Sequence, residues 1–304
     1  MRKIGVTGGT GFIGRYLLKE GCDKYEFVVL TSGKSDRNRI ESPNVNYVVG
    51  DYSLGNLEDV FCQCDAIVHL GARRSSPENE NAFHNYYDNL EFSENVFSVA
   101  RDLGIDNVVN ISSTAVYDDT LKAPFYEEMA VAPINFYGVS KRTIELIATM
   151  YNKKYDMNIK SLRLAQVIGA GERAGYILSV FTDLCKEGKK LPVYGKGRSG
   201  KEYIYVKDVV RAIFAAVENA QSRGIYNIGS GVFTPNRQLA EAFCSAFDNK
   251  AGIEYLMDKK EVVRDYYMDV SRARDEIGFS CAYDLESALL DLRSELEASA
   301  HGKY

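Results

Sequence analysis

"VTGGTGFIG", Val6–Gly14, is a glycine-rich turn between a strand-like run, "KIGV", and a segment with helical periodicity. Gly8 and Gly11 permit a tight turn that lets the backbone approach a pyrophosphate, and Gly14 lets the next helix pack closely on the sheet. The N-terminus of that helix favours negative charge. Glycine also collects in turns for steric reasons alone, but the flanking strand and helix favour a dinucleotide-binding loop. Its predicted cofactor contacts are Gly8, Thr10, Gly11, Phe12, Ile13 and Gly14.

Short apolar runs alternate with amphipathic segments through the first half of the chain. Several runs are apolar throughout, which is typical of strands covered by helices on both faces. Strands are predicted at 3–8, 27–30, 46–51, 66–72, 108–113 and 159–169, and helices at 11–19, 89–103 and 137–154. This alternation predicts an α/β fold, Rossmann-like, with a doubly wound parallel sheet.

The alternation changes near Gly169, after which helical segments are separated by glycine-containing turns and short strands. We predict an NAD(P)-binding domain over 1–168 and a smaller mixed α/β C-terminal lobe that binds the substrate over most of 169–304. The segment 202–228 is expected to return to the first domain.

The net charge of −5 argues against a sequence-independent nucleic-acid-binding protein, which needs a basic surface. No apolar stretch approaches the length of a membrane span. The six cysteines form no C-x-x-C pair and the three histidines are scattered, so no metal site is predicted. Free cysteines without such a framework suggest a reduced, cytoplasmic protein.

"FYGVSK" contains Tyr137 and Lys141, whose spacing of four residues places both side chains on one face of a helix. A tyrosine hydroxyl has a pKa near ~10 and transfers protons poorly at neutral pH, but a neighbouring cation favours the phenolate. The pattern Y-x-x-x-K also arises by chance in a chain with 21 tyrosines. Ser113, at the end of the strand "VVNISS", supplies a third polar group, although such a hydroxyl often caps the next turn.

The spacing T-G-x-x-G-x-x-G, followed in order by Ser113, Tyr137 and Lys141, resembles the extended short-chain dehydrogenase/reductases, in particular the NAD-dependent epimerase/dehydratase family. The resemblance runs from Lys3 to about Leu292. It implies that Ser113 orients the reacting oxygen, that Tyr137 exchanges a proton with a sugar hydroxyl, and that Lys141 holds the nicotinamide ribose. It also implies a homodimer formed through the helices at 89–103 and 137–154.

The same resemblance implies further cofactor contacts. "GDY" is similar to the family segment that meets the adenine, and "IVHLGA" to the strand whose end lies along the cofactor. The Asn of "YYDN" supports the cofactor site in related epimerases. The implied residues are Asp51, Tyr52, Leu70, Gly71, Ala72, Arg74 and Asn89.

A nucleotide-diphospho-sugar is the implied substrate. Gln166 stands where related epimerases contact the diphosphate, and Lys201 replaces the usual phosphate-binding arginine, as a point charge without a bidentate fork. For the cations, a solvated surface position is an equal alternative. The substrate candidates are Arg73, Thr114, Gln166, Arg198, Lys201 and Arg264.

The end of the second strand lacks the carboxylate that binds the adenosine ribose in NAD-preferring members. Thr31, Ser32 and Lys34 stand there instead, with Gly33 between them. Small hydroxyls and a cation suit a 2′-phosphate, so NADP(H) is the predicted cofactor, with NAD(H) as the alternative. A polar surface loop would have the same composition.

These features predict a 4-keto-6-deoxyhexose reductase acting at C4 of the nucleotide sugar. The alternative is a nucleotide-sugar 4-epimerase, which recycles a retained cofactor, and a distant alternative is a non-catalytic dinucleotide-sensing protein. Dehydratases of the family follow the serine with an Asp-Glu pair. Here Thr114 and Ala115 occupy those positions, and neither can act as the acid or base.

Overall fold

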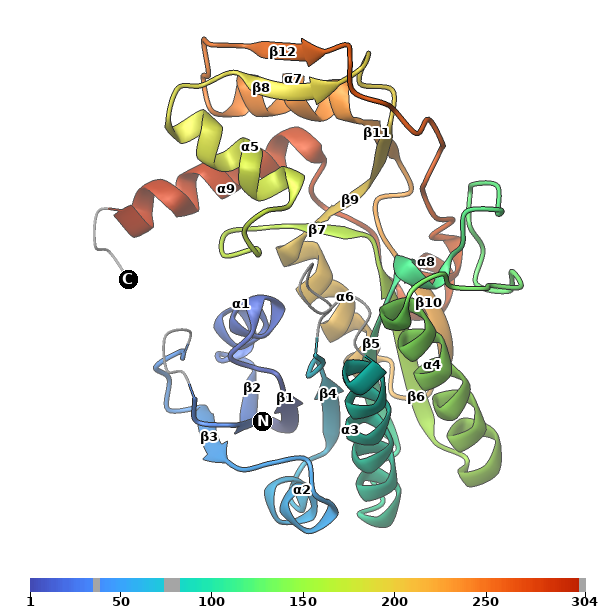
Figure 1. Ribbon diagram of the computed structural model, residues 1–304. Helices are drawn as coiled ribbons and strands as arrows, with labels where there is room; N and C mark the ends of the chain where they lie inside the picture. Colours follow the sequence, from blue (N-terminus) through green and yellow to red (C-terminus); the bar gives the residue numbers. More distant parts are fainter. Residues whose placement is uncertain (35–38, 74–82, 301–304) are drawn as a thin grey trace.

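The computed structural model describes residues 1–34, 39–73 and 83–300. Seven strands form a parallel sheet in the order β10-β6-β5-β4-β1-β2-β3 (Figure 1). This confirms the predicted Rossmann-like α/β fold. The strands are β1 (Arg2–Thr7), β2 (Tyr25–Thr31), β3 (Val45–Val49), β4 (Ala66–His69), β5 (Asn107–Ser113), β6 (Asn158–Leu164) and β10 (Gly224–Ile228).

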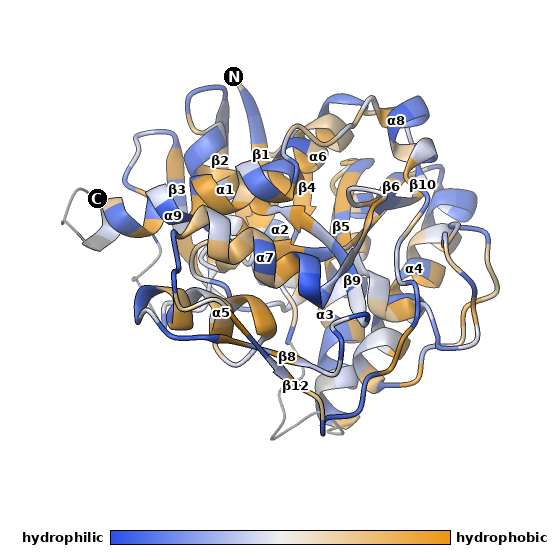
Figure 2. Cartoon of the chain, turned by 90° about the horizontal axis from the view of Figure 1, so that it is seen from above, coloured by the Kyte–Doolittle hydropathy of each residue, from blue (hydrophilic) through white to orange (hydrophobic). Residues whose placement is uncertain are grey.

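Helices cover both faces of this sheet. One face carries α1 (Phe12–Gly21) and α6 (Val206–Glu218), and the other carries α2 (Leu54–Phe61), α3 (Phe83–Asp102) and α4 (Phe136–Tyr155). Strand side chains alternate between two separate cores, so that Val68 packs towards α1 and α6 while its neighbour Ile67 packs towards α2 and α3. Figure 2 shows hydrophobic residues concentrated on these central strands.

A smaller C-terminal lobe lies above the carboxyl ends of the strands (Figure 1). It contains a three-stranded sheet, a two-stranded sheet and three helices among the residues described. These elements are β7 (Gln166–Ile168), α5 (Ile177–Lys186), β8 (Leu191–Tyr194), β9 (Gly200–Tyr205), β11 (Phe233–Pro235), α7 (Asn236–Ala246), β12 (Ile253–Leu256) and α9 (Leu285–Ala300). The remaining helix, α8 (Ser271–Ile277), packs against β10 of the large sheet.

Two predicted elements differ from the structure where the chain passes between domain and lobe. The run predicted as one strand at 159–169 is divided at Ala165, whose N–H donates to the Ile228 carbonyl at 3.0 Å. β6 stays in the large sheet, whereas β7 pairs with β9. Within 202–228, α6 and β10 pack with the large sheet, while β9 belongs to the lobe.

The helices that carry the predicted site begin at specific contacts. α4 starts after Asn135, whose side chain accepts a hydrogen bond from the Gly138 N–H at 2.8 Å. α3 is described from Phe83, six residues before its predicted start at 89, and Phe83 and Tyr86 pack on Phe136 of α4.

The described helices are all too short or too polar to cross a membrane. The same residues contain no group of three metal-binding side chains. α4 exposes Leu146 and Met150 on its outer face. The homodimer expected through this helix stays a prediction.

A lysine is buried near the amino end of β6, whereas the glycine-rich loop follows the carboxyl end of β1. Lys160 of β6 has no exposed surface, and its Nζ donates to Asn107 Oδ1 at 2.6 Å. Burial lowers the pKa of this amine from 10.5 to about 7. The unfolded chain therefore binds more protons than the folded chain between these values, and stability rises with pH across that window.

We expect Lys160→Met to stabilise the protein relative to the wild type more at pH 7 than at pH 10, because methionine removes a buried charge that high pH neutralises anyway. The difference in the free energy of unfolding should shrink by on the order of 2 kcal/mol over that range. Urea unfolding at both pH values measures it, with the exposed Lys153→Met as control. A stability difference that does not change with pH contradicts the prediction.

Candidate functional site

The glycine-rich turn forms a cradle at the N-terminus of α1. Gly8 has a φ of +70°, and its carbonyl accepts from the Gly11 N–H at 3.0 Å. A Cβ at Gly14 would lie 2.4 Å from the Gly8 oxygen, so only glycine fits this close approach. No side chain caps the start of α1. The helix N–H groups and dipole therefore suit the pyrophosphate of a dinucleotide.

A cleft of about 640 Å³ extends from this cradle across the carboxyl ends of the strands. Its walls bring together most of the predicted cofactor residues, namely Gly8, Thr10, Gly11, Phe12, Ile13, Gly14, Thr31, Ser32, Asp51, Tyr52, Leu70, Gly71, Ala72, Tyr137 and Lys141. Lys34 is exposed beyond the end of β2 and does not line the cleft. Arg74 lies outside the described residues. The groups present fit a dinucleotide.

Asn89 lies behind the cleft wall and does not line it. Its Oδ1 accepts from the Arg73 N–H at 2.7 Å and its Nδ2 donates to the Arg73 carbonyl at 2.9 Å. Asn89 thus fixes the backbone that follows β4 through one hydrogen bond on each of its two amide atoms.

A directed chain of hydrogen bonds joins the cradle to this backbone. Ser93 donates to the Asn89 carbonyl at 2.8 Å, so its oxygen must accept from His69 Nε2 at 3.0 Å. His69 Nδ1 is then an acceptor, and Thr7 donates to it at 2.7 Å. The Thr7 oxygen accepts in turn from the Gly71 N–H at 3.2 Å. The chain fixes His69 as the Nε2–H tautomer.

His69 is also held in its neutral form. Full burial, reinforced by the nearby Lys141 cation, lowers the pKa of the imidazole to about 3. The neutral imidazole therefore adds no second positive charge beside Lys141. It also allows Nδ1 to accept from Thr7 at every physiological pH.

The three predicted catalytic residues lie where two cavities meet: Tyr137 and Lys141 line the cofactor cleft, and Tyr137 also lines an adjoining pocket with Ser113. Lys141 is buried, its Nζ lies 5.8 Å from the centre of the Tyr137 ring, and it donates to the Ile111 carbonyl at 2.6 Å. Ser113 Oγ accepts from the Ala115 N–H at 3.1 Å, which is the capping role considered as its alternative. That bond orients the oxygen and leaves the Ser113 hydroxyl proton available for a substrate oxygen.

A buried ion pair ties the helix of Tyr137 and Lys141 to β6, and a hydrogen bond to the same carboxylate ties it to β5, the strand of Ser113. Glu145, one turn beyond Lys141, accepts two hydrogen bonds of 2.8 Å from Arg163 of β6. Ser112 Oγ donates to the same carboxylate at 2.6 Å. Both charged side chains are fully buried. α4 is therefore fixed against both β5 and β6 directly behind the catalytic groups.

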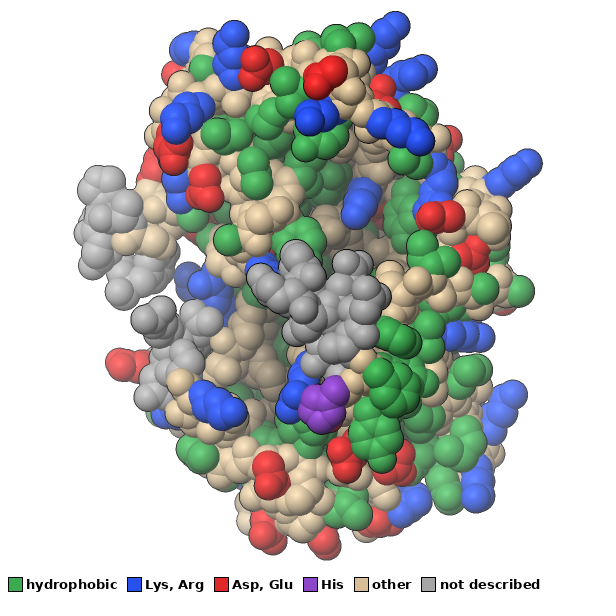
Figure 3. Space-filling model, in the orientation of Figure 1, with side chains coloured by type: hydrophobic (Ala, Val, Ile, Leu, Met, Phe, Trp, Pro, Cys, Tyr) green, Lys and Arg blue, Asp and Glu red, His purple; other side chains and the backbone are tan. Residues whose placement is uncertain are grey.

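A second cavity, of about 460 Å³, opens from the catalytic groups towards the C-terminal lobe. Figure 3 shows this face hollowed between the lobe and the sheet domain. Four of the predicted substrate residues line the cavity together with Ser113 and Tyr137, namely Thr114, Gln166, Lys201 and Arg264.

The cations of this cavity differ in how they are held. Lys201 has an exposed side chain, yet the protein groups around the cavity desolvate its amine and lower its pKa. Arg264 forms an ion pair with Asp119 and lies over the Tyr266 ring, 4.9 Å from its centre. Both cations line the second cavity, and neither lines the cofactor cleft.

Two predicted substrate cations are elsewhere. Arg198 is exposed and pairs with Glu261 at 3.7 Å, so it does not line the cavity. Arg73 lines the cofactor cleft and pairs with Asp88 at 2.6 Å. Each is held by a carboxylate that sequence spacing did not indicate.

Residues 4–229 match the model of the NAD dependent epimerase/dehydratase family. The chain belongs to this family. It is therefore an enzyme of the extended short-chain dehydrogenase/reductase group, as its motifs predicted.

Both epimerases and dehydratases are among the proteins similar to this chain. The crystal structure of UDP-N-acetylglucosamine 4-epimerase from Bacillus cereus superposes with a TM-score of 0.85 at 29% identity, covering 98% of this chain and 97% of that one. A putative UDP-glucose 4-epimerase of Methanocaldococcus jannaschii is 26% identical, over 93% of this chain and 95% of the relative. A dTDP-glucose 4,6-dehydratase of Streptomyces griseus is also 26% identical, over 93% and 90%.

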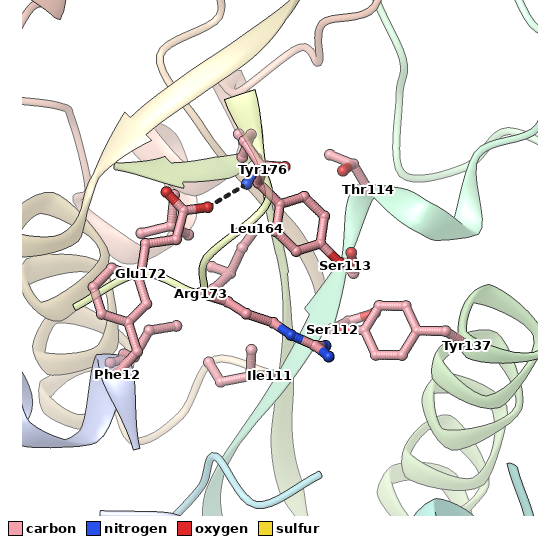
Figure 4. A pocket seen from close by; sticks show the side chains of 14 residues that line it. Phe12, Ile111, Ser112, Ser113, Thr114, Tyr137, Leu164, Glu172, Arg173 and Tyr176 are labelled. Carbon is pink, nitrogen blue, oxygen red and sulfur yellow. Dashed lines mark hydrogen bonds between the residues drawn. The ribbon is translucent and has the colours of Figure 1, made fainter. Parts of the chain in front are cut away.

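The sequence did not indicate which residues form one wall of the pocket that contains Ser113 and Tyr137. Glu172, Arg173 and Tyr176, from the segment between β7 and α5, line the pocket with Ser113 and Tyr137 (Figure 4). Glu172 accepts from Gln166 Nε2 at 2.9 Å. The segment has no regular periodicity, and only its position after β7 could have indicated it.

We expect the His69 imidazole to remain neutral, with its proton on Nε2, from pH 5 to pH 9, because burial disfavours the cation. Nitrogen-15 NMR of the imidazole rings measures tautomer and charge, and the loss of one signal in His69→Gln assigns it among the three histidines. A His69 signal that titrates within this range would contradict the hydrogen-bond assignment.

Proposed function

We propose that this enzyme moves a hydride between NADP(H) and C4 of a nucleotide-diphospho-hexose. The observation that carries the proposal is the position of Tyr137, which lines both the cofactor cleft and the substrate cavity. A proton donor shared by the two sites can act on a sugar oxygen while the adjacent carbon meets the nicotinamide.

The residues at the junction have distinct tasks in this proposal. A bound reduced nicotinamide supplies hydride to the C4 carbon of a keto sugar, and its oxidised form takes hydride from the C4 alcohol. Tyr137 donates a proton to the C4 oxygen in reduction and removes it in oxidation. Lys141 stabilises the tyrosinate by its charge, and Ser113 donates a hydrogen bond to the same sugar oxygen.

The groups around Ser113 support hydride transfer without elimination of water. Thr114 and Ala115 line the substrate cavity where an acid–base pair would be needed, and neither side chain titrates near neutral pH. The Thr114 carbonyl is occupied by the Tyr266 hydroxyl at 2.6 Å. Dehydration therefore has no evident general acid or base at these positions.

The end of β2 supports NADP(H) over NAD(H). Thr31 is buried and its oxygen accepts from the Gly33 N–H at 3.3 Å, whereas Ser32 is exposed and lines the cleft. No carboxylate stands among residues 31–34. A 2′-phosphate at this end would meet the Ser32 hydroxyl without like-charge repulsion, and Lys34, outside the cleft, is the nearest cation in the sequence.

The cofactor preference indicates which of the family's reactions the enzyme catalyses. A reductase consumes NADPH in each turnover, so the loop favours a 4-keto-6-deoxyhexose reductase. A 4-epimerase is the second candidate, because relatives named as 4-epimerases match this chain over nearly its whole length. The two reactions use the same groups of this site and differ in whether NADPH is consumed.

We expect the enzyme to oxidise NADPH with a nucleotide-4-keto-6-deoxyhexose, and Tyr137→Phe to lower kcat by at least about 100-fold, because the proton donor is lost. NADPH fluorescence measures turnover across a panel of such sugars, and Tyr155→Phe, an exposed tyrosine of the same helix, is the matched control. Interconversion of UDP-sugar epimers without net NADPH consumption would identify the epimerase instead. NADPH binding without either reaction would indicate the non-catalytic sensor.

We expect Ser32→Asp to raise the KM for NADPH about tenfold and to leave the KM for NADH nearly unchanged, because a carboxylate repels only the 2′-phosphate. Steady-state kinetics with both cofactors measure the change, and Ser294→Asp on the exposed face of α9 controls for added charge. Equal effects on NADPH and NADH contradict the NADP(H) assignment.

A further inference from the structure

The segment 169–176 connects β7 to α5 and forms one wall of the catalytic pocket. Its side chains Glu172, Arg173 and Tyr176 face Ser113 and Tyr137 across that pocket (Figure 4). The segment contains no helix or strand. Its path must therefore be fixed largely by contacts with other elements, and those contacts decide where two charged groups stand.

The segment packs against the first turn of α1. The Arg15 guanidinium donates to the Ala170 carbonyl. Gly171 has a φ of +81°, and a Cβ there would lie 2.6 Å from Arg15 Nη2. A Cβ at Gly169 would lie 2.9 Å from the Phe12 ring. Two glycines thus permit the backbone to lie directly against the helix.

Arg15 makes the principal polar contact between α1 and the segment 169–176. It follows Gly14, the last glycine of the pyrophosphate cradle, and is half-buried. The Tyr16 hydroxyl also reaches the Ala170 carbonyl, but at 3.4 Å, and it donates to Glu295 of α9 at 2.5 Å. A charged donor at a carbonyl makes the stronger hydrogen bond of the two.

The first turn of α1 contributes residues to both binding sites. Phe12 and Ile13 line the cofactor cleft and also the pocket that holds Glu172 and Arg173. A pyrophosphate on the N-terminus of α1 is therefore one helical turn from the Arg15 contact. If the bound cofactor orders this turn of α1, it also orders the segment 169–176, because the two are in direct contact and the sheet is not involved.

We propose that Arg15 is a positioning residue that holds the segment 169–176 against the cofactor-binding helix, so that cofactor binding orders Glu172, Arg173 and Tyr176 around the sugar. The inference rests on the proposed function for its substrate, a nucleotide-diphospho-hexose. It gives Arg15 no contact with the reacting atoms. Loss of Arg15 should weaken sugar-nucleotide binding while leaving the cofactor cleft intact.

The first test compares kinetics and cofactor binding in Arg15→Ala. The KM for the nucleotide sugar should rise about tenfold, because a charged hydrogen bond that positions the segment is lost. The Kd for NADPH, from its fluorescence, should stay near the wild-type value. Arg15→Lys keeps a donor and should recover part of the KM. Lys19→Ala, which removes a cation from the same helix, is the control and should change neither constant.

Gly171→Ala gives an independent variant of the same contact, since it strains a positive φ and crowds Arg15. The same rise in KM with an unchanged Kd for NADPH is expected. An equal rise in both constants for Arg15→Ala would show that Arg15 only supports α1 and would overturn the proposal.

The second test needs no sugar substrate, so it separates this proposal from the proposed function. Amide hydrogen exchange of residues 172–176 should slow when NADPH saturates the wild-type enzyme, and should not slow in Arg15→Ala. Exchange that NADPH leaves unchanged in the wild type would overturn the coupling, even if turnover is observed. Coupling without turnover on any nucleotide sugar would instead overturn the proposed substrate alone.

Discussion

The buried ion pair between Arg163 and Glu145 is the constraint on which the catalytic geometry depends. It joins β6 to α4, and Ser112 adds β5 through the same carboxylate. Arg163 also donates to the Tyr117 hydroxyl, which donates to Asn227 of β10. Such a pair adds little net stability compared with an apolar contact, but removing one partner leaves a buried charge at a cost of about 3–5 kcal/mol. Its benefit is a fixed spacing between one helix and three strands.

The parallel sheet then brings distant residues to one edge. Because all seven strands run the same way, the ends of β1, β4 and β5 lie together, although Thr7, His69 and Ser113 are far apart in sequence. The register pairs Thr7 with His69 directly, and their side chains are hydrogen-bonded. The cofactor cleft therefore follows from topology as much as from the glycine-rich turn.

This dependence explains what the sequence could predict. The glycine cradle and the Ser113, Tyr137 and Lys141 set depend on local spacing and strand order, and their placement around the cofactor cleft and the pocket beside it could be inferred from the chain alone. Arg198 and Asn89 depend on tertiary partners, Glu261 and the Arg73 backbone, that no spacing rule connects to them. The split of the run 159–169 also follows from pairing with β9, which a periodic apolar pattern does not encode.

The two sides of the junction are built by different means, and this difference has a chemical consequence. Tyr137 and Lys141 stand on a capped helix with a buried ion pair behind it, so their geometry tolerates little change. The facing wall is an irregular segment with glycines at 169, 171 and 175, held by a hydrogen bond from α1. In the proposed reaction, hydride and proton transfer would thus depend on groups fixed by the sheet domain, and contacts with the sugar on a segment held by the cofactor-binding helix.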